Sequence, residues 1–249
     1  MRDYRRYYFS KKEYVLFAIQ ALGIVSLVSY LFYHSLLAMV LVIPFYPVFL
    51  RMKAQVLLQK QKSMLQEQFK EAICALATAL GAGYSIENAW KEARKEVEKL
   101  FGEHALIVQE LNHMLAHLEM NVSLEELLSD FALRSGLEDV GSFCQVFLFA
   151  KRSGGDFIGI IHATANRISR KVDLQREIIT DLAARRLESR VMNMVPMFML
   201  LYLNLTSPGY FDLLYGNLSG VIIMSLCLLF YLLAYVWSER MLQNITNVW

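Results

Sequence analysis

The sequence has 249 residues, 56% of them hydrophobic, and a formal net charge of +2. Soluble globular domains are typically about 45–50% apolar, so the composition argues against an ordinary soluble domain, and the small net charge indicates no particular class of partner. The charges are also segregated, because residues 14–50 contain no Asp, Glu, Lys or Arg and Asp212 is the only charged residue between 191 and 238. This segregation predicts a membrane protein.

Residues 1–13 form a basic arm. Its lysines and arginines alternate with tyrosines: Arg2, Tyr4, Arg5, Arg6, Tyr7, Tyr8, Lys11 and Lys12. Basic side chains beside a membrane bind anionic head groups, and tyrosine favours the membrane–water interface. We therefore expect a cytoplasmic juxtamembrane anchor here, and no nucleic-acid site.

Each uncharged block has room for two membrane spans joined by a short turn, since one span needs about 20 predominantly apolar residues. We predict one transmembrane hairpin over residues 14–50 and a second over 191–238. The four predicted spans lie at about 14–33, 36–50, 191–205 and 218–237. All lysines and arginines lie outside the two blocks. Because positive charge favours the cytoplasmic side, the middle segment 51–190, the short tail 239–249 and both termini are predicted to be cytoplasmic.

The middle segment has the pattern of helix almost throughout, because it contains no proline and no strictly alternating stretch. Glycines and caps divide it into six predicted helices: about 52–80, 86–100, 103–119, 124–135, 140–153 and 157–190, the last running into the third span. The predicted N-caps are Ser85, Ser123, Asp139 and Asp156. Six amphipathic helices with short loops favour an antiparallel bundle. The predicted fold class is therefore all-α. On the last helix, Asp181 and Arg185 are four residues apart and are expected to pair on a solvated face.

Two motifs invite a catalytic or metal-binding interpretation, and both lack a required residue. Gly154-Gly155-Asp156-Phe157 is similar to the active-site loop of cyclic-dinucleotide cyclases, but Phe157 stands where a second acidic residue is needed. His113 and His117 have the spacing of metal ligands on a helix, but Met114 stands where a zinc protease has its glutamate. We expect a helix stop with an N-cap in the first case, and packed or solvated histidines in the second.

No other residues indicate an enzyme. The sequence contains neither a nucleotide-binding glycine loop nor a Gly-x-Ser-x-Gly motif. Cys74, Cys144 and Cys227 are far apart and are expected to be reduced, buried small side chains. We predict a protein that is not an enzyme and has no cofactor and no metal.

Several segments resemble the type II secretion system F domain family in their order and spacing. Gly81-Ala-Gly-Tyr-Ser-Ile-Glu-Asn-Ala89 resembles the turn that opens this domain, and Ile178–Pro196 resembles its exit into the membrane. The later signature of the family is similar to Val122–Leu128, Phe131–Arg134 and Phe149–Asp156. The similarity covers roughly residues 64–238. Paired spans on either side of a single such domain make the layout closest to the tight-adherence (Tad, or Flp pilus) B and C platform proteins.

This resemblance implies an oligomeric, multi-pass platform protein of a bacterial inner membrane, in a type IV pilus or related secretion machine. The implied partners are a hexameric motor ATPase, prepilin, a paralogous platform protein and membrane lipid. Because they interrupt otherwise continuous helices, two loops are candidate motor contacts: Gly81, Gly83 and Tyr84, with Gly154, Gly155 and Asp156. Residues near the third span are candidates for coupling the last helix to the membrane: Arg185, Arg186, Arg190 and Pro196. Helix termination for the glycines and positive-inside anchoring for the arginines are the simpler alternatives.

Two other classes of function stay open. A small membrane transport component would usually carry ionisable residues at bilayer depth, and Asp212, the only candidate, is predicted to lie in an outer loop. A membrane-anchored enzyme would need a polar cluster in the helical segment.

Overall fold

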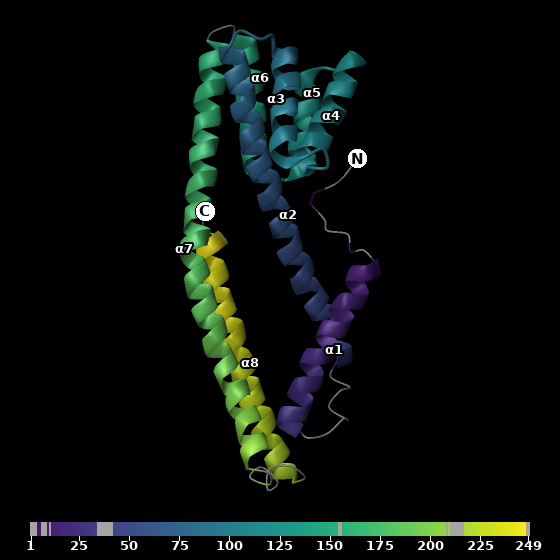
Figure 1. Ribbon diagram of the computed structural model, residues 1–249, viewed down its shortest axis with the longest axis vertical. Helices are drawn as coiled ribbons and strands as arrows, with labels where there is room; N and C mark the ends of the chain where they lie inside the picture. Colours follow the sequence, from purple (N-terminus) through teal and green to yellow (C-terminus); the bar gives the residue numbers. More distant parts are fainter. Residues whose placement is uncertain are drawn as a thin grey trace. The chain divides into compact units, whose positions relative to one another are not determined.

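A computed structural model describes residues 4–5, 9, 11–33, 42–153, 156–207, 209 and 217–247. Within these residues the regular structure is entirely helical, with no strand, as the all-α prediction requires. The helices are α1 (Lys11–Tyr33), α2 (Val42–Gly81), α3 (Ile86–Phe101), α4 (Leu106–Glu119), α5 (Leu124–Ser135), α6 (Glu138–Ser153), α7 (Phe157–Thr206) and α8 (Leu218–Asn247) (Figure 1).

The chain divides into two compact units. The first, here the core unit, comprises Met1–Tyr8 and Ala54–Gln175, and the second, here the apolar unit, comprises Phe9–Lys53 and Arg176–Trp249. The helices α2 and α7 each contribute residues to both units.

Local signals set the ends of the short helices in the core unit. The Ser85 hydroxyl accepts from the Asn88 N–H at 3.4 Å before α3, and the Ser123 hydroxyl accepts from the Glu126 N–H at 3.3 Å before α5. Gly136, with φ of +60°, is the left-handed C-cap of α5. These caps confirm the boundaries predicted from sequence, because the serine oxygens satisfy N–H groups that have no partner inside the helix.

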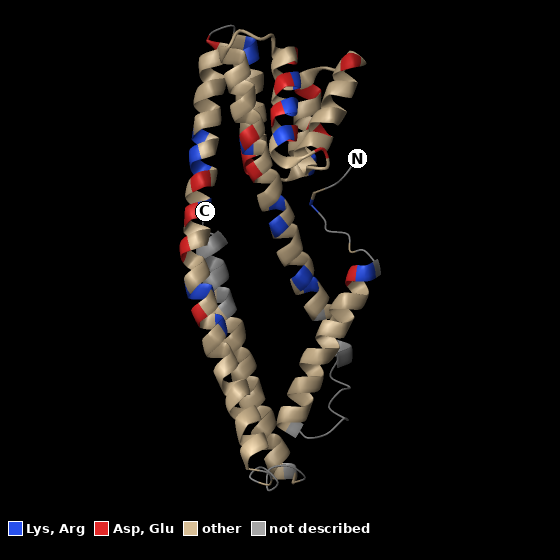
Figure 2. Ribbon diagram, viewed as in Figure 1, with Lys and Arg blue, Asp and Glu red and all other residues tan. Residues whose placement is uncertain are grey.

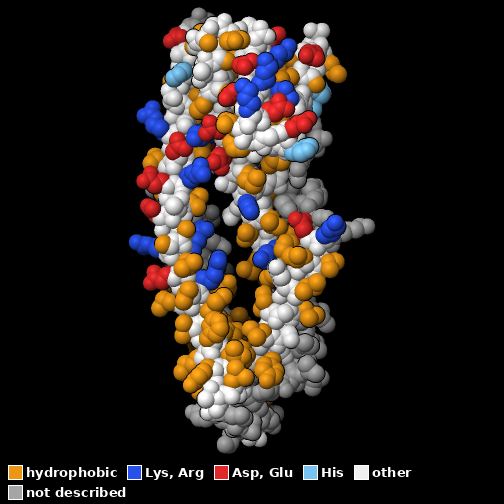
Figure 3. All heavy atoms as spheres, in the orientation of Figure 1, with side chains coloured by type: hydrophobic (Ala, Val, Ile, Leu, Met, Phe, Trp, Pro, Cys, Tyr) orange, Lys and Arg blue, Asp and Glu red, His pale blue; other side chains and the backbone are white. Residues whose placement is uncertain are grey.

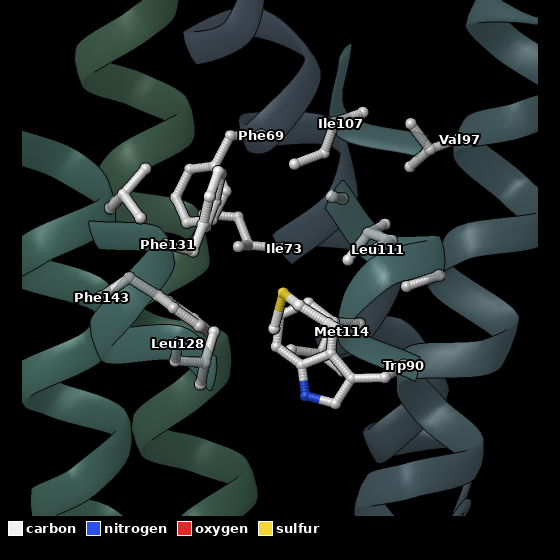
Figure 4. Packing of buried hydrophobic residues seen from close by; sticks show 14 of the residues in the cluster. Phe69, Ile73, Trp90, Val97, Ile107, Leu111, Met114, Leu128, Phe131 and Phe143 are labelled. Carbon is white, nitrogen blue, oxygen red and sulfur yellow. The ribbon is translucent and has the colours of Figure 1, made fainter. Parts of the chain in front are cut away.

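The core unit encloses one hydrophobic cluster to which all six of its helical segments contribute. At its centre, Phe143 of α6 lies edge-on to Phe69 of α2, with ring centroids 5.7 Å apart, and to Trp90 of α3 at 6.4 Å. Figure 4 shows these rings with Phe131 among aliphatic side chains from α2 to α6. Four apolar residues of α5 that recur at helical spacing are buried in this cluster: Leu124, Leu127, Leu128 and Phe131.

The prediction that Asp139 caps α6 is wrong. The helix begins at Glu138, so Asp139 lies within its first turn, where it is buried. Its carboxylate accepts from Gln66 Nε2 at 2.6 Å and from Lys171 Nζ at 2.7 Å. The cause is tertiary: a buried carboxylate needs hydrogen-bonded or charged partners, and α2 and α7 supply them.

The apolar unit contains two helical stretches that are long and apolar enough to cross a membrane. Among the described residues, these are Lys12–Phe32 and Ser219–Ser238, with mean hydropathies of 2.2 and 2.3. Only 28% and 11% of their residues are buried, which differs from the core helix of a soluble protein. Apart from Lys12 and Glu13 these two stretches carry no described charge (Figure 2). Many hydrophobic side chains of this unit lie at its surface (Figure 3).

Candidate functional site

The first candidate contact loop is the turn after α2. The Tyr84 N–H donates to the Ala79 carbonyl at 3.2 Å, and the Gly83 N–H donates to the Leu80 carbonyl at 3.0 Å. This pair of bonds, with φ of +88° at Gly83, is a Schellman motif. Gly81 is the last residue of α2, and the Tyr84 side chain is 50% exposed. The turn therefore ends the helix and presents an aromatic ring to solvent.

The second candidate loop precedes α7. Gly154 and Gly155 lie outside the described residues. Asp156 is exposed, and its Oδ1 accepts from the Gly159 N–H at 2.9 Å, which confirms it as the predicted N-cap of α7. A Cβ at Gly159 would overlap this carboxylate. The end of α2 and the start of α7 lie at the same end of the core unit (Figure 1).

The candidate coupling residues all lie on α7, which continues without a break from Phe157 to Thr206. Arg185 and Arg190 are exposed and Arg186 is half-buried. Among the ion pairs of the described residues, the predicted pair between Asp181 and Arg185 does not occur. An exposed pair of this kind contributes little, about 0.3–0.5 kcal/mol on a helix, so its absence costs the helix little.

Pro196 stands inside α7, where the ring leaves the Met192 carbonyl without its usual helical donor. One residue farther along, the Asn193 carbonyl accepts from the Tyr231 hydroxyl of α8 at 2.8 Å. The Ser189 and Ser238 hydroxyls make a second α7–α8 contact at 2.8 Å. Pro196 also lines an apolar cavity of about 420 Å³, together with residues of α1 and α8 such as Phe32 and Met224.

The histidine pair of α4 packs on itself. The His113 and His117 rings lie 4.0 Å apart, and His117 Nδ1 is 2.9 Å from the His113 carbonyl. Burial, with the nearby His117, lowers the pKa of His113. Among the described residues, no group of three or more His, Cys, Asp or Glu side chains could hold a metal ion, and the three cysteines are free. Cys144 is buried, whereas Cys227 is exposed on α8.

Sequence reasoning missed a buried ion pair in the core unit. Arg134 of α5 donates to both carboxylate oxygens of Glu110 in α4, with Nη1–Oε1 at 3.0 Å and Nη2–Oε2 at 2.8 Å. The Tyr4 hydroxyl donates to the same carboxylate at 2.9 Å. Tyr4 is thus buried in the core unit, and the expectation that it lies at a membrane interface is wrong. A tyrosine in a basic arm gave no signal of this contact, since its partners are more than 100 residues away.

Comparison with known families identifies one match. The model of the family described as "Type II secretion system (T2SS), protein F" matches residues 72–204, which is more than half of the chain. The matched region begins in α2 and ends in α7, so it includes all of α3 to α6. No curated protein and no solved structure matches the chain.

Proposed function

The chain belongs to the type II secretion system protein F family, and on this premise we propose that it is a non-catalytic platform protein of a bacterial inner membrane. In this role it assembles a type IV pilus or type II secretion-like machine through contacts with other proteins. The observation that carries the proposal is the family match over the helices of the core unit, in a chain that also has apolar helices on both sides of that match.

We further propose that the platform is of the tight-adherence type and crosses the membrane four times. The spans Lys12–Phe32 and Ser219–Ser238 support the outer two crossings. The uncharged stretches at 36–50 and 191–205 would supply the inner two, with both termini and residues 51–190 cytoplasmic. Reporter fusions after residues 34, 120, 212 and 249 test this topology. Export of only the fusions at 34 and 212 is the expected pattern, and export at 120 would reject it.

A platform without a nucleotide-binding motif needs a motor from another subunit. We therefore propose that a hexameric ATPase binds the end of the core unit that carries Tyr84 and Asp156, where α2 ends and α7 starts (Figure 1). Movement would then pass along α7 through Arg185, Arg186 and Arg190 towards Pro196 in the apolar unit. Prepilin and a paralogous platform protein would contact the membrane-spanning helices.

Co-purification tests the function. A tagged chain is isolated from native membranes, and the associated proteins are identified by mass spectrometry. A secretion ATPase and a small pilin should be recovered together with it. Recovery of the chain alone, or with a nucleotide-binding transport subunit, would reject the platform proposal in favour of a transporter.

A pair of matched variants tests the contact surface. Tyr84→Ala removes a half-exposed ring and retains the backbone bonds of the turn, whereas Leu133→Ala removes an exposed apolar side chain from α5. Tyr84→Ala is expected to lower recovery of the ATPase, and Leu133→Ala to leave it unchanged. Equal recovery with both variants would remove Tyr84 from the contact.

A further inference from the structure

Tyr4 is the only described aromatic residue of the basic arm that lies in the core unit, and it is 1% exposed. Its ring belongs to the main hydrophobic cluster. The next residue of that cluster along the chain is Leu65 of α2, so Tyr4 is distant in sequence from every other member. The hydroxyl donates to Glu110 Oε1 at 2.9 Å, and the Tyr4 N–H donates to the Arg134 carbonyl at 3.2 Å. The side chain and the backbone N–H of Tyr4 are therefore both bound.

The pocket for this tyrosine is built from charged groups that satisfy one another. Glu110 is 5% exposed, and both of its carboxylate oxygens accept from Arg134. Arg134 Nε also donates to Asp130 at 2.7 Å. Burial opposes the charge on Arg134, but hydrogen bonds to the two carboxylates outweigh it and raise the pKa of Arg134. The pocket thus presents a fixed, buried acceptor, which suits a phenolic O–H donor.

The residue after Tyr4 crosses the end of α5. A Cβ on Gly136 would lie 3.3 Å from Arg5 Cγ, closer than side chains normally approach, and Gly136 has φ of +60°. Glycine at this position therefore serves both the helix cap and the passage of the arm. The Arg5 side chain shares the C-terminal end of α5 with Lys62, whose Nζ would lie 3.6 Å from the same Cβ.

We infer that the face formed by α4 and α5 is a peptide-binding site for the chain's own basic arm, with Tyr4 as its anchor. The site recognises a phenol through Glu110 and a backbone N–H through the Arg134 carbonyl. In sequence, residues 5–10 alone separate Tyr4 from α1, so the bound arm tethers the first candidate membrane span to the core unit. Release of the arm would lengthen that tether. This inference does not depend on the proposed function.

A photo-crosslinking amino acid at position 5 tests the site in the full-length protein in its native membrane. Arg5 is exposed, so the probe reports on the bound arm without filling the tyrosine pocket. Irradiation is expected to join the arm to the segment around Gly136 within the same chain, as located by mass spectrometry. Adducts with lipid, or a crosslinked dimer in which the arm of one copy lies on another, would overturn the inference.

Two substitutions of Tyr4, each made in the protein that carries the crosslinking amino acid at position 5, test whether the pocket requires the ring and the hydroxyl. Tyr4→Ala removes the anchor and should lower the intramolecular crosslink about ten-fold, because a buried hydrogen bond to a charged group and the ring contacts are both lost. Tyr4→Phe retains the ring and removes only the donor, so an intermediate yield is expected and the fold is preserved. An unchanged crosslink in both variants would show that Tyr4 does not anchor the arm.

Discussion

At the scale of single residues, the Glu110–Arg134 ion pair is the most consequential contact in the core unit. Its two side chains are 7% and 14% exposed, whereas the surface pair Glu92–Lys95 is 40% and 58% exposed. Removing one partner from a buried pair leaves an uncompensated charge, which typically costs about 3–5 kcal/mol. Arg134→Ala should therefore lower the free energy of unfolding by about 3 kcal/mol, at the lower end of the range for such pairs.

Chemical denaturation of the detergent-purified protein checks this loss. Lys95→Ala is the matched control, since an exposed pair contributes at most about 1 kcal/mol. Equal losses in the two variants would mean that the pair is not buried in solution.

The pH dependence of stability should report on His113. Burial is the main cause that lowers its pKa, followed by His117 and Arg134, whereas Glu110 and Asp130 oppose the shift. Because the unfolded histidine takes up its proton near the ordinary value of about 6.5, the unfolded state binds more protons as the pH falls below that value. Stability should therefore decrease with falling pH until the lower pKa of the folded state is passed.

Thermal unfolding between pH 8 and pH 5 tests this dependence. His113→Gln should give a flatter decrease in Tm below pH 6.5 than the unmodified protein. The Tm of each protein is expressed relative to its own value at pH 8, where the imidazole is neutral. Any effect of the substitution that does not depend on pH then cancels. Parallel curves for the two proteins would reject the role of His113.

Residue contacts also mark where sequence reasoning failed. Ser85 and Ser123 could be predicted as caps because each bonds a backbone N–H three residues away. Asp139 and Tyr4 could not, since their partners are 32 to 106 residues distant in sequence. A short polar side chain before a helix can be predicted as a cap, because it bonds a backbone group nearby in sequence. The partners of a buried carboxylate or phenol are determined only when the helices pack.

At the scale of elements, the two glycines at the end of α2 affect stability in opposite ways: one allows a left-handed backbone, and the other weakens a helix. Gly83 needs φ of +88°, whereas Gly81 is helical, and neither has any atom within 4 Å of an added Cβ. Gly83→Ala should destabilise the protein by about 1 kcal/mol, because a left-handed backbone is strained for alanine. Gly81→Ala should stabilise it by up to about 1 kcal/mol, because alanine favours the helix.

Opposite shifts in Tm for these two alanine variants are the expected result. Destabilisation by both substitutions would indicate that the Gly81 site is packed against another surface, such as a bound subunit, and not open. The comparison is therefore informative both in the purified protein and in membranes that contain the proposed partners.

Helix boundaries also depend partly on neighbouring residues and partly on residues that are distant in sequence, and only the first kind could be predicted. The third predicted helix was expected from about residue 103, but α4 begins at Leu106 with Ala105 as a cap that makes no side-chain bond. The Ile107 N–H instead donates to Gln68 of α2 at 3.1 Å. A side chain from another helix thus serves the first turn of α4, and no pattern within residues 100–110 indicates it.

At the scale of the whole molecule, hydropathy identified the two apolar blocks, and the family match identifies residues 72–204 as a type II secretion system protein F domain. Among the described residues, two of the four predicted spans lie in helical stretches that are long and apolar enough to cross a membrane. Of the second predicted span, 36–50, only residues 42–50 are described, and they form the start of α2; the third, 191–205, is part of α7. In each of these helices an apolar stretch adjoins a charged one. Neither helix is apolar as a whole, so only the uncharged stretches indicate those crossings.

The continuity of α7 leads to the last prediction. If this helix transmits movement from a motor to the membrane, a flexible break near Ser189 should stop fibre output and leave motor binding intact. A four-residue Gly-Ser insertion after Ser189 tests this, with pilin export and ATPase co-purification as the two measurements. Ser189→Ala controls for loss of the hydroxyl contact with Ser238. The same insertion after Met120, in the turn between α4 and α5, controls for added length. Export that survives the insertion after Ser189 would mean that α7 anchors the protein without driving anything.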